Sequence, residues 1–103
     1  MNGQSTSSDF LLEPADNQRL ANLCGQFDEH LRQMEQRLGV EINNRGNLFR
    51  IIGDNQAPVK VAETVIKELY ATTDHEAVTP EGVHLMLQQK VGDIESVSAS
   101  IKR

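Results

Sequence analysis

The segment Gly25-Gln26-Phe27-Asp28 joins two predicted helices, and the chemistry open to it is anion binding. Free backbone N–H groups at the start of a helix attract phosphate, and the helix dipole adds to this attraction. Asp28 opposes it, because an aspartate at the N-cap accepts the same N–H groups and places negative charge where phosphate would lie. We therefore favour a structural corner in which Asp28 caps the second helix. A phosphate contact at Gly25 and Gln26 is the alternative.

Arg45 and Arg50 are the best basic candidates for a contact with RNA or with a protein partner. They lie on a predicted hairpin that has Gly46 and Asn47 at its turn. The other interpretation is that both arginines are ordinary solvated side chains of exposed strands and that Gly46 serves only the turn geometry.

Groups for metal binding or catalysis do not occur at suitable spacings. Cys24 and His30 are six residues apart across a helix junction, without the second Cys/His pair that a zinc site would need. His75 and His84 are also unpaired, and no set of residues stands out as an activated nucleophile. We expect no metal, no cofactor and no catalytic residue in this chain.

Local patterns predict the elements that would position these residues. The first half should contain a mobile polar leader over 1–8, a strand in "DFLLEP", a helix in "NQRLANLC" capped by Asp16 and closed by a left-handed Gly25, and a second helix that ends at Gly39. The second half should contain a hairpin over 40–53, a long helix in 54–73 with Pro58 in its first turn, and a further helix that starts at Thr79-Pro80.

The same patterns predict the core. Three sets of apolar residues are expected to be buried: the helical stripe Phe27, Leu31, Met34 and Leu38, the hairpin face Val40, Ile42, Phe49 and Ile51, and one side of the long helix, Val59, Ala62, Val65, Ile66 and Leu69. With Gly46-Asn47 as the turn residues, Ile42 should pair with Ile51, and Asn44 with Phe49.

Composition indicates one small globular domain. The chain has 103 residues, of which 38% are hydrophobic and 24% charged, and no apolar run approaches the length that spans a bilayer. The single cysteine fits a reducing compartment, so we expect a cytoplasmic protein with no membrane contact. A net charge of -5 opposes general electrostatic attraction to nucleic acid, so any RNA site must be local.

The predicted order of strand, helix, helix, strand, strand and helix, with a glycine turn between the first two helices, resembles a type I KH domain, an RNA- or single-stranded-DNA-binding module. This resemblance implies an α+β fold in which a three-stranded sheet packs on helices, with one extra C-terminal helix. The GxxG motif of KH domains is Gly25-Gln26-Phe27-Asp28 here, so Asp28 replaces its second glycine.

A second resemblance covers about residues 10 to 90. "LEPADNQRLANLCGQFDEHLRQMEQRLGVEINNRGN" is similar to the opening of PhoH-like proteins, bacterial P-loop ATPases often linked to phosphate starvation and RNA metabolism. It implies a KH-like domain over 9–72, a loop and appended helix over 73–90, and a linker over 91–103 toward an ATPase domain. This sequence has no G-x-x-x-x-G-K-[ST], so ATP and Mg would belong to that other domain.

Two functions remain open at this point. In the first, the chain is a non-catalytic accessory module that contacts single-stranded RNA. In the second, it is a protein-interaction module that contacts the ATPase domain or an endoribonuclease partner. The acidic charge and the altered GxxG favour the second mechanistically, and the KH resemblance favours the first.

Overall fold

A computed structural model describes residues 6–102, with side chains to residue 92. The described elements, in chain order, are β1 (Thr6–Leu11), α1 (Asn17–Cys24), the short 3-10 turn η1 (Gln26–Asp28), α2 (Glu29–Leu38), β2 (Glu41–Arg45), β3 (Leu48–Gly53), α3 (Gln56–Thr72) and α4 (Pro80–Lys102). The predicted order of strands and helices is confirmed.

The three described strands form one antiparallel sheet in the order β1-β3-β2. The hairpin register is the predicted one, since Ile42 pairs with Ile51 and Asn44 pairs with Phe49. Gly46 has a φ of 61°, which is the left-handed region that glycine tolerates best. Within residues 6–102, the outer strands β1 and β2 each have one edge with no strand beside it.

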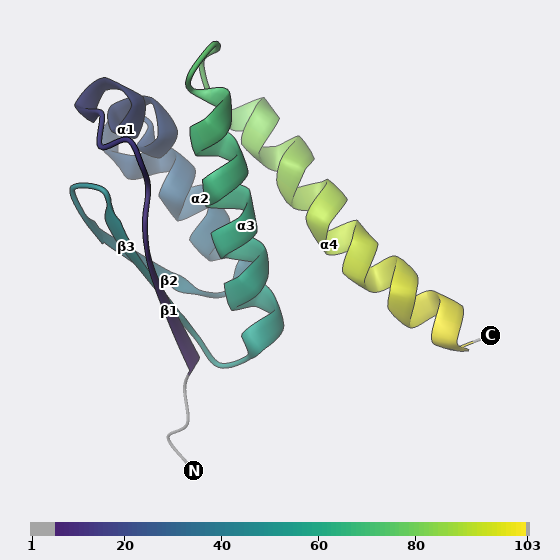
Figure 1. Cartoon of the computed structure of the whole chain (residues 1–103). Coiled ribbons are helices and arrows are strands. Elements are labelled where there is room, and N and C mark those ends of the chain that lie inside the picture. Colours follow the sequence, from purple (N-terminus) through teal and green to yellow (C-terminus); the bar gives the residue numbers. More distant parts are fainter. Residues whose placement is uncertain (1–5, 103) are drawn as a thin grey trace.

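The core lies between one face of the sheet and the helices (Figure 1). Hairpin residues Val40, Ile42, Phe49 and Ile51 are buried there, as predicted from their alternation. Helix α3 crosses the sheet with five predicted residues buried, Val59, Ala62, Val65, Ile66 and Leu69. The opposite sheet face carries the outward-pointing residues of the strands and has no helix over it among the described residues.

Two predicted caps are confirmed. The Asp16 carboxylate accepts the backbone N–H groups of Gln18 and Arg19 at 2.9 and 3.2 Å, which satisfies two donors at the start of α1. Thr79 Oγ1 accepts the N–H of Gly82 at 3.0 Å at the start of α4. The predicted end of α2 at Gly39 is also confirmed, and this glycine has the left-handed conformation.

Two predicted irregular segments are wrong. The leader over 1–8 is too long, because Thr6 to Ser8 already pair with β3; residues 1–5 lie outside the described part. The linker over 91–103 is also wrong, because α4 continues to Lys102, and residue 103 lies outside the described part. Gly92 lacks the β-carbon that favours helix, yet it reduces helix stability by only about 1 kcal/mol, and no proline follows it to stop the helix.

Helix α4 packs its first half against α2 and α3, where Val83 and Leu87 are buried. Its second half extends away from the other elements (Figure 1). No helix among the described residues combines the length and the apolar character needed to cross a membrane.

Candidate nucleic-acid interface

The turn between α1 and α2 differs from the predicted cap. Asp28 has a φ of 57° and a ψ of 29°, and its side chain makes no capping hydrogen bond. An N-cap needs an extended backbone for its side chain to reach the N–H groups ahead of it, and a left-handed residue does not provide that geometry. The prediction that Asp28 caps α2 is therefore wrong.

Gly25 is required at this turn by its backbone and by its neighbour. Its φ is 81° and its ψ is 177°, so it has the predicted positive φ but not the left-handed helical conformation. A β-carbon at this position would lie 2.7 Å from Nδ1 of His30. His30 is buried, and its Nδ1 is 3.0 Å from the carbonyl oxygen of Leu23, to which it donates as the Nδ1–H tautomer.

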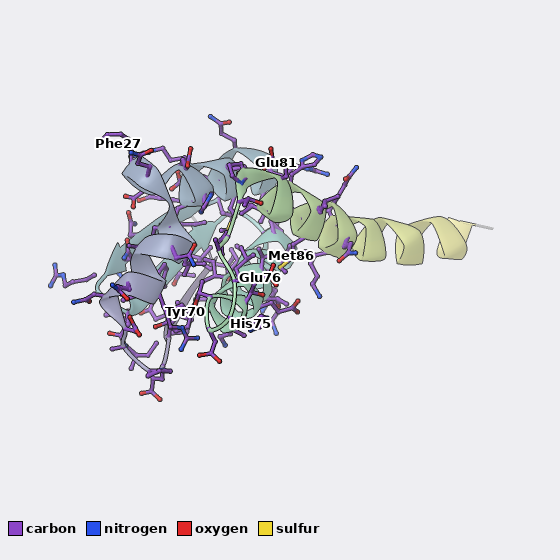
Figure 2. The ribbon with its side chains drawn as sticks, turned by 90° about the horizontal axis from the view of Figure 1, so that it is seen from above. Phe27, Tyr70, His75, Glu76, Glu81 and Met86 are labelled. Carbon is purple, nitrogen blue, oxygen red and sulfur yellow. The ribbon has the colours of Figure 1, made fainter. Side chains whose placement is uncertain are left out.

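Phe27 is the second residue that departs from the prediction. Its ring was expected in the core with Leu31 and Met34, but it is 90% exposed, whereas those two are buried. Figure 2 shows its side chain at the outer margin of the molecule, pointing away from the other elements. The cause is the backbone: with a φ of 55°, Phe27 is not part of the helix, so the helical spacing to Leu31 does not apply.

A polar groove of about 260 Å³ lies between α2 and the free edge of β2. It begins beside the turn, and its lining consists of Asp28, Leu31, Arg32, Glu35, Ile42, Asn43 and Asn44. Arg32 is the single basic side chain of this lining, and two carboxylates lie beside it. None of the ion pairs between described residues involves Arg32.

The β2 edge presents backbone groups to this groove. In an antiparallel pair, the N–H and C=O of one residue point together, either to the partner strand or away from it, and the direction alternates along the strand. The N–H of Ile42 donates to the Glu35 carboxylate at 2.8 Å, so the backbone N–H and C=O of Ile42 point away from β3. Asn44, two residues further on, therefore also directs its N–H and C=O outward. These groups can recognise the edge of a flat polar ligand.

The hairpin arginines lie on the other face of the sheet. Arg50 makes two hydrogen bonds to the Asp9 carboxylate, at 2.8 and 3.0 Å, which lower the pKa of Asp9 and raise that of Arg50. Arg45 takes part in no ion pair between described residues. Both line a shallow hollow of about 360 Å³ that also includes Asn43, Asn44 and Leu48. Because Asn43 and Asn44 line both hollows, β2 forms the border between them.

The remaining predicted contact residues have structural positions. Asn47 ties the hairpin turn to the end of β1, since its side chain donates to the Leu12 carbonyl and its own carbonyl accepts from the Leu12 N–H, both at 2.9 Å. Gly46 is exposed at the tip with open space around it. Gln26 is exposed beside Phe27 on the turn. The structure thus separates the predicted residues into a turn group and a hairpin group.

Sequence reasoning missed Arg32 and Glu35 as groove residues. Part of the signal was present, because Arg32 and Glu35 are three residues apart and therefore share one face of the helix, whereas Asp28 lies outside α2. Their spacing does not show that the edge of β2 lies opposite them.

The buried groups near the turn show no site for a metal ion. Burial raises the pKa of the Cys24 thiol from 9.0 to about 11, and the negative charge of Asp28 adds to the increase. Such a thiol stays protonated and unreactive near neutral pH. Within the described part of the chain, no three His, Cys, Asp or Glu side chains gather as metal ligands would.

Comparison with solved structures identifies the class of fold. The chain is similar to the crystal structure of Dim2p from Pyrococcus horikoshii OT3, with a TM-score of 0.67, over 85% of this chain and 51% of that one. The two are only 19% identical, so this similarity shows the fold alone. The chain has the α+β, KH-like fold that the sequence predicted.

Comparison with curated sequences gives the relatives. PhoH-like proteins from Mycobacterium bovis and from two strains of Mycobacterium tuberculosis are 36% identical to it over 74 residues. The match covers 71% of this chain and 21% of each relative. The resemblance to PhoH-like proteins is thus confirmed for a segment that spans about a fifth of their length. No protein-family profile matches the chain.

Proposed function

We propose that this chain is a non-catalytic module that binds single-stranded nucleic acid, RNA in particular, for a PhoH-like ATP-binding protein. The observation that carries the proposal is the groove between α2 and the free edge of β2, on a KH-like fold. KH modules are among the common folds that take single strands, whose unstacked bases expose their hydrogen-bonding edges.

The chemistry of the groove suits a base better than a phosphate. Asn44 offers one backbone donor and one backbone acceptor at the strand edge, and the carbonyl of Ile42 offers a second acceptor. Donor and acceptor groups along one edge match the Watson–Crick edge of a base. Asp28 and Glu35 would repel a phosphate placed close to them, so the sugar-phosphate backbone of the nucleic acid should run past Arg32 instead.

The negative net charge limits the expected affinity for nucleic acid. With a net charge of -5 and one arginine in the groove, few phosphates are neutralised, so binding should be weak and shallow in its salt dependence. ATP and Mg would be bound by the part of a PhoH-like protein that this segment does not match, since this sequence has no P-loop motif.

Fluorescence anisotropy with a short labelled single-stranded RNA pool, titrated at salt concentrations between about 50 and 200 mM, tests the proposal. We expect measurable binding at the low end and a slope of log K against log salt that decreases by about 0.7 in Arg32→Ala, the value for one lost phosphate contact on a single strand. Arg37→Ala is the matched control, because Arg37 is exposed on the same helix but does not line the groove.

Absence of binding at the lowest salt would overturn the proposal. It would leave the second function, a contact with the ATPase domain or with an endoribonuclease, as the better account. Loss of binding in Arg45→Ala and Arg50→Ala, with Arg32→Ala unchanged, would instead move the site to the open face of the sheet.

A further inference from the structure

The Phe27 ring is exposed on a strained turn. Bulky residues rarely adopt a positive φ, and here two consecutive non-glycine residues, Phe27 at 55° and Asp28 at 57°, do so. The strain brings no burial in return, because the Phe27 ring is 90% exposed. Outliers of this kind persist where the surroundings enforce them, and they gather at ligand sites.

The surroundings of Phe27 do enforce the conformation. The Gly25 N–H donates to the carbonyl of Ala21 at 2.9 Å, and the Asp28 N–H donates to the carbonyl of Gly25 at 3.2 Å, which closes the turn. Below the turn, buried His30 fills the space beside Gly25 so closely that a β-carbon would collide with it. The turn cannot move inward, so the Phe27 ring stays on the solvent side of the turn.

The position of the ring connects it to the groove. Asp28, which follows Phe27 directly, is the groove residue at the turn end, and Arg32 lies one helical turn further along α2. A nucleic-acid strand that lies in the groove would reach Phe27 where it leaves the groove at the Asp28 end. No other described phenylalanine or tyrosine ring offers this contact, because Phe49 and Tyr70 are buried and Phe10 is half-buried on β1, where it stacks on Phe49.

We propose that Phe27 is a stacking platform for a nucleobase, so that the Gly25 turn holds a base where the GxxG pattern suggests a phosphate. This inference rests on the proposed function and adds a subsite to the same groove. A base is uncharged and its flat face is attracted to an aromatic ring, whatever its sequence. The carboxylates of Asp28 and Glu29, which oppose a phosphate at this turn, leave such stacking intact.

The test combines a protein change with a nucleic-acid change. Short single-stranded RNA is compared with the same RNA carrying abasic positions, for wild type, Phe27→Ala and Phe27→Tyr, at low salt. Stacking on one ring corresponds to a loss of about tenfold in affinity on alanine substitution. We expect wild type and Phe27→Tyr to prefer the intact RNA by about tenfold, and Phe27→Ala to bind both RNAs with the same reduced affinity.

Leu85→Ala is the matched control, because Leu85 is also a large exposed apolar residue, at 60%, but lies on α4 away from the groove. Thermal melting of each variant shows whether the fold is kept. Removal of the exposed Phe27 ring should leave the melting temperature unchanged. A 2-aminopurine base in the RNA gives a direct signal, since stacking quenches its fluorescence in wild type and not in Phe27→Ala.

The outcomes separate two failures. If wild type binds RNA but Phe27→Ala keeps the preference for intact bases, the platform is wrong and the proposed function stands. If wild type binds no single-stranded RNA, both are wrong, and the exposed ring is better read as an anchor for a protein surface.

Discussion

The β2–β3 hairpin and the Gly25 turn are two tight reversals of the same chain. The structure confirms the prediction for the hairpin and contradicts the prediction for the turn. In the hairpin, the predicted pairing of Ile42 with Ile51 and the predicted buried face are both found. At the turn, the predicted cap at Asp28 and the predicted burial of Phe27 are both wrong. Each reversal contains a glycine with a positive φ, so the glycine alone does not explain the difference.

The difference lies in what determines each reversal. A hairpin is specified by a period of two along the sequence and by two turn residues, both of which are local and visible. The Gly25 turn is specified by the packing of His30 below it, which leaves no room for a β-carbon and is not visible in a pattern of apolar residues. Side-chain packing around His30 therefore determines the conformation of the turn, whereas the local sequence pattern determines the conformation of the hairpin.

Two phenylalanines give the largest contrast between these regions. Phe49 in the hairpin is 0% exposed, and Phe49→Ala should reduce the free energy of unfolding by about 3–5 kcal/mol. Phe27→Ala should change it by less than about 0.5 kcal/mol, because the ring loses almost no contact. Urea unfolding of both variants measures this; a large loss in Phe27→Ala would show that the ring packs against the fold.

The two turn glycines give the next contrast. Gly25→Ala combines a positive φ of 81° with a β-carbon 2.7 Å from His30, and should reduce stability by about 2–4 kcal/mol. Gly46→Ala has a positive φ of 61° but open space, so only the backbone strain of about 1–2 kcal/mol remains. Equal losses in the two variants, measured by the same urea unfolding, would contradict the account of packing at the turn.

The buried thiol at the end of α1 gives a pH-dependent effect. The pKa of Cys24 is about 11 in the folded chain and 9.0 ordinarily, so between these values the unfolded chain releases the proton first. The contribution of the Cys24 thiol to the free energy of unfolding is therefore fully present below pH 9 and falls by about 1.4 kcal/mol per pH unit up to pH 11. Melting curves of wild type and Cys24→Ala over this range should diverge in slope; parallel curves would place the thiol in water.

The smallest effect concerns Asp28. Since its side chain does not cap α2 and its φ is positive, Asp28→Gly should relieve strain and raise stability by about 0.5–1 kcal/mol. Asp28→Ala should be less stable than Asp28→Gly by about 1–2 kcal/mol. Reduced stability in Asp28→Gly would restore the predicted cap, and thermal melting of the two variants decides between them.

The predictable part of this molecule follows from the same contrast. Local patterns determine the order of elements along the chain, the hairpin register, the Asp16 and Thr79 caps and the buried face of α3, and each of these was predicted from the sequence. The α2–β2 groove was not, because it joins residues on a helix and on a strand edge whose approach is set by the bond between Glu35 and the Ile42 N–H. The second half of α4 was missed because propensity in a polar segment is a weak signal.

A titration of the isotope-labelled chain with single-stranded RNA, followed by backbone amide NMR shifts at low salt, tests the central claim most directly. The groove account predicts that the largest shifts gather at the turn, along α2 near Arg32 and at the outer edge of β2 near Asn44. Amides near the ion pair of Asp9 and Arg50, on the open face of the sheet, should move little. Shifts confined to that open face, or no shifts at all, would contradict the account.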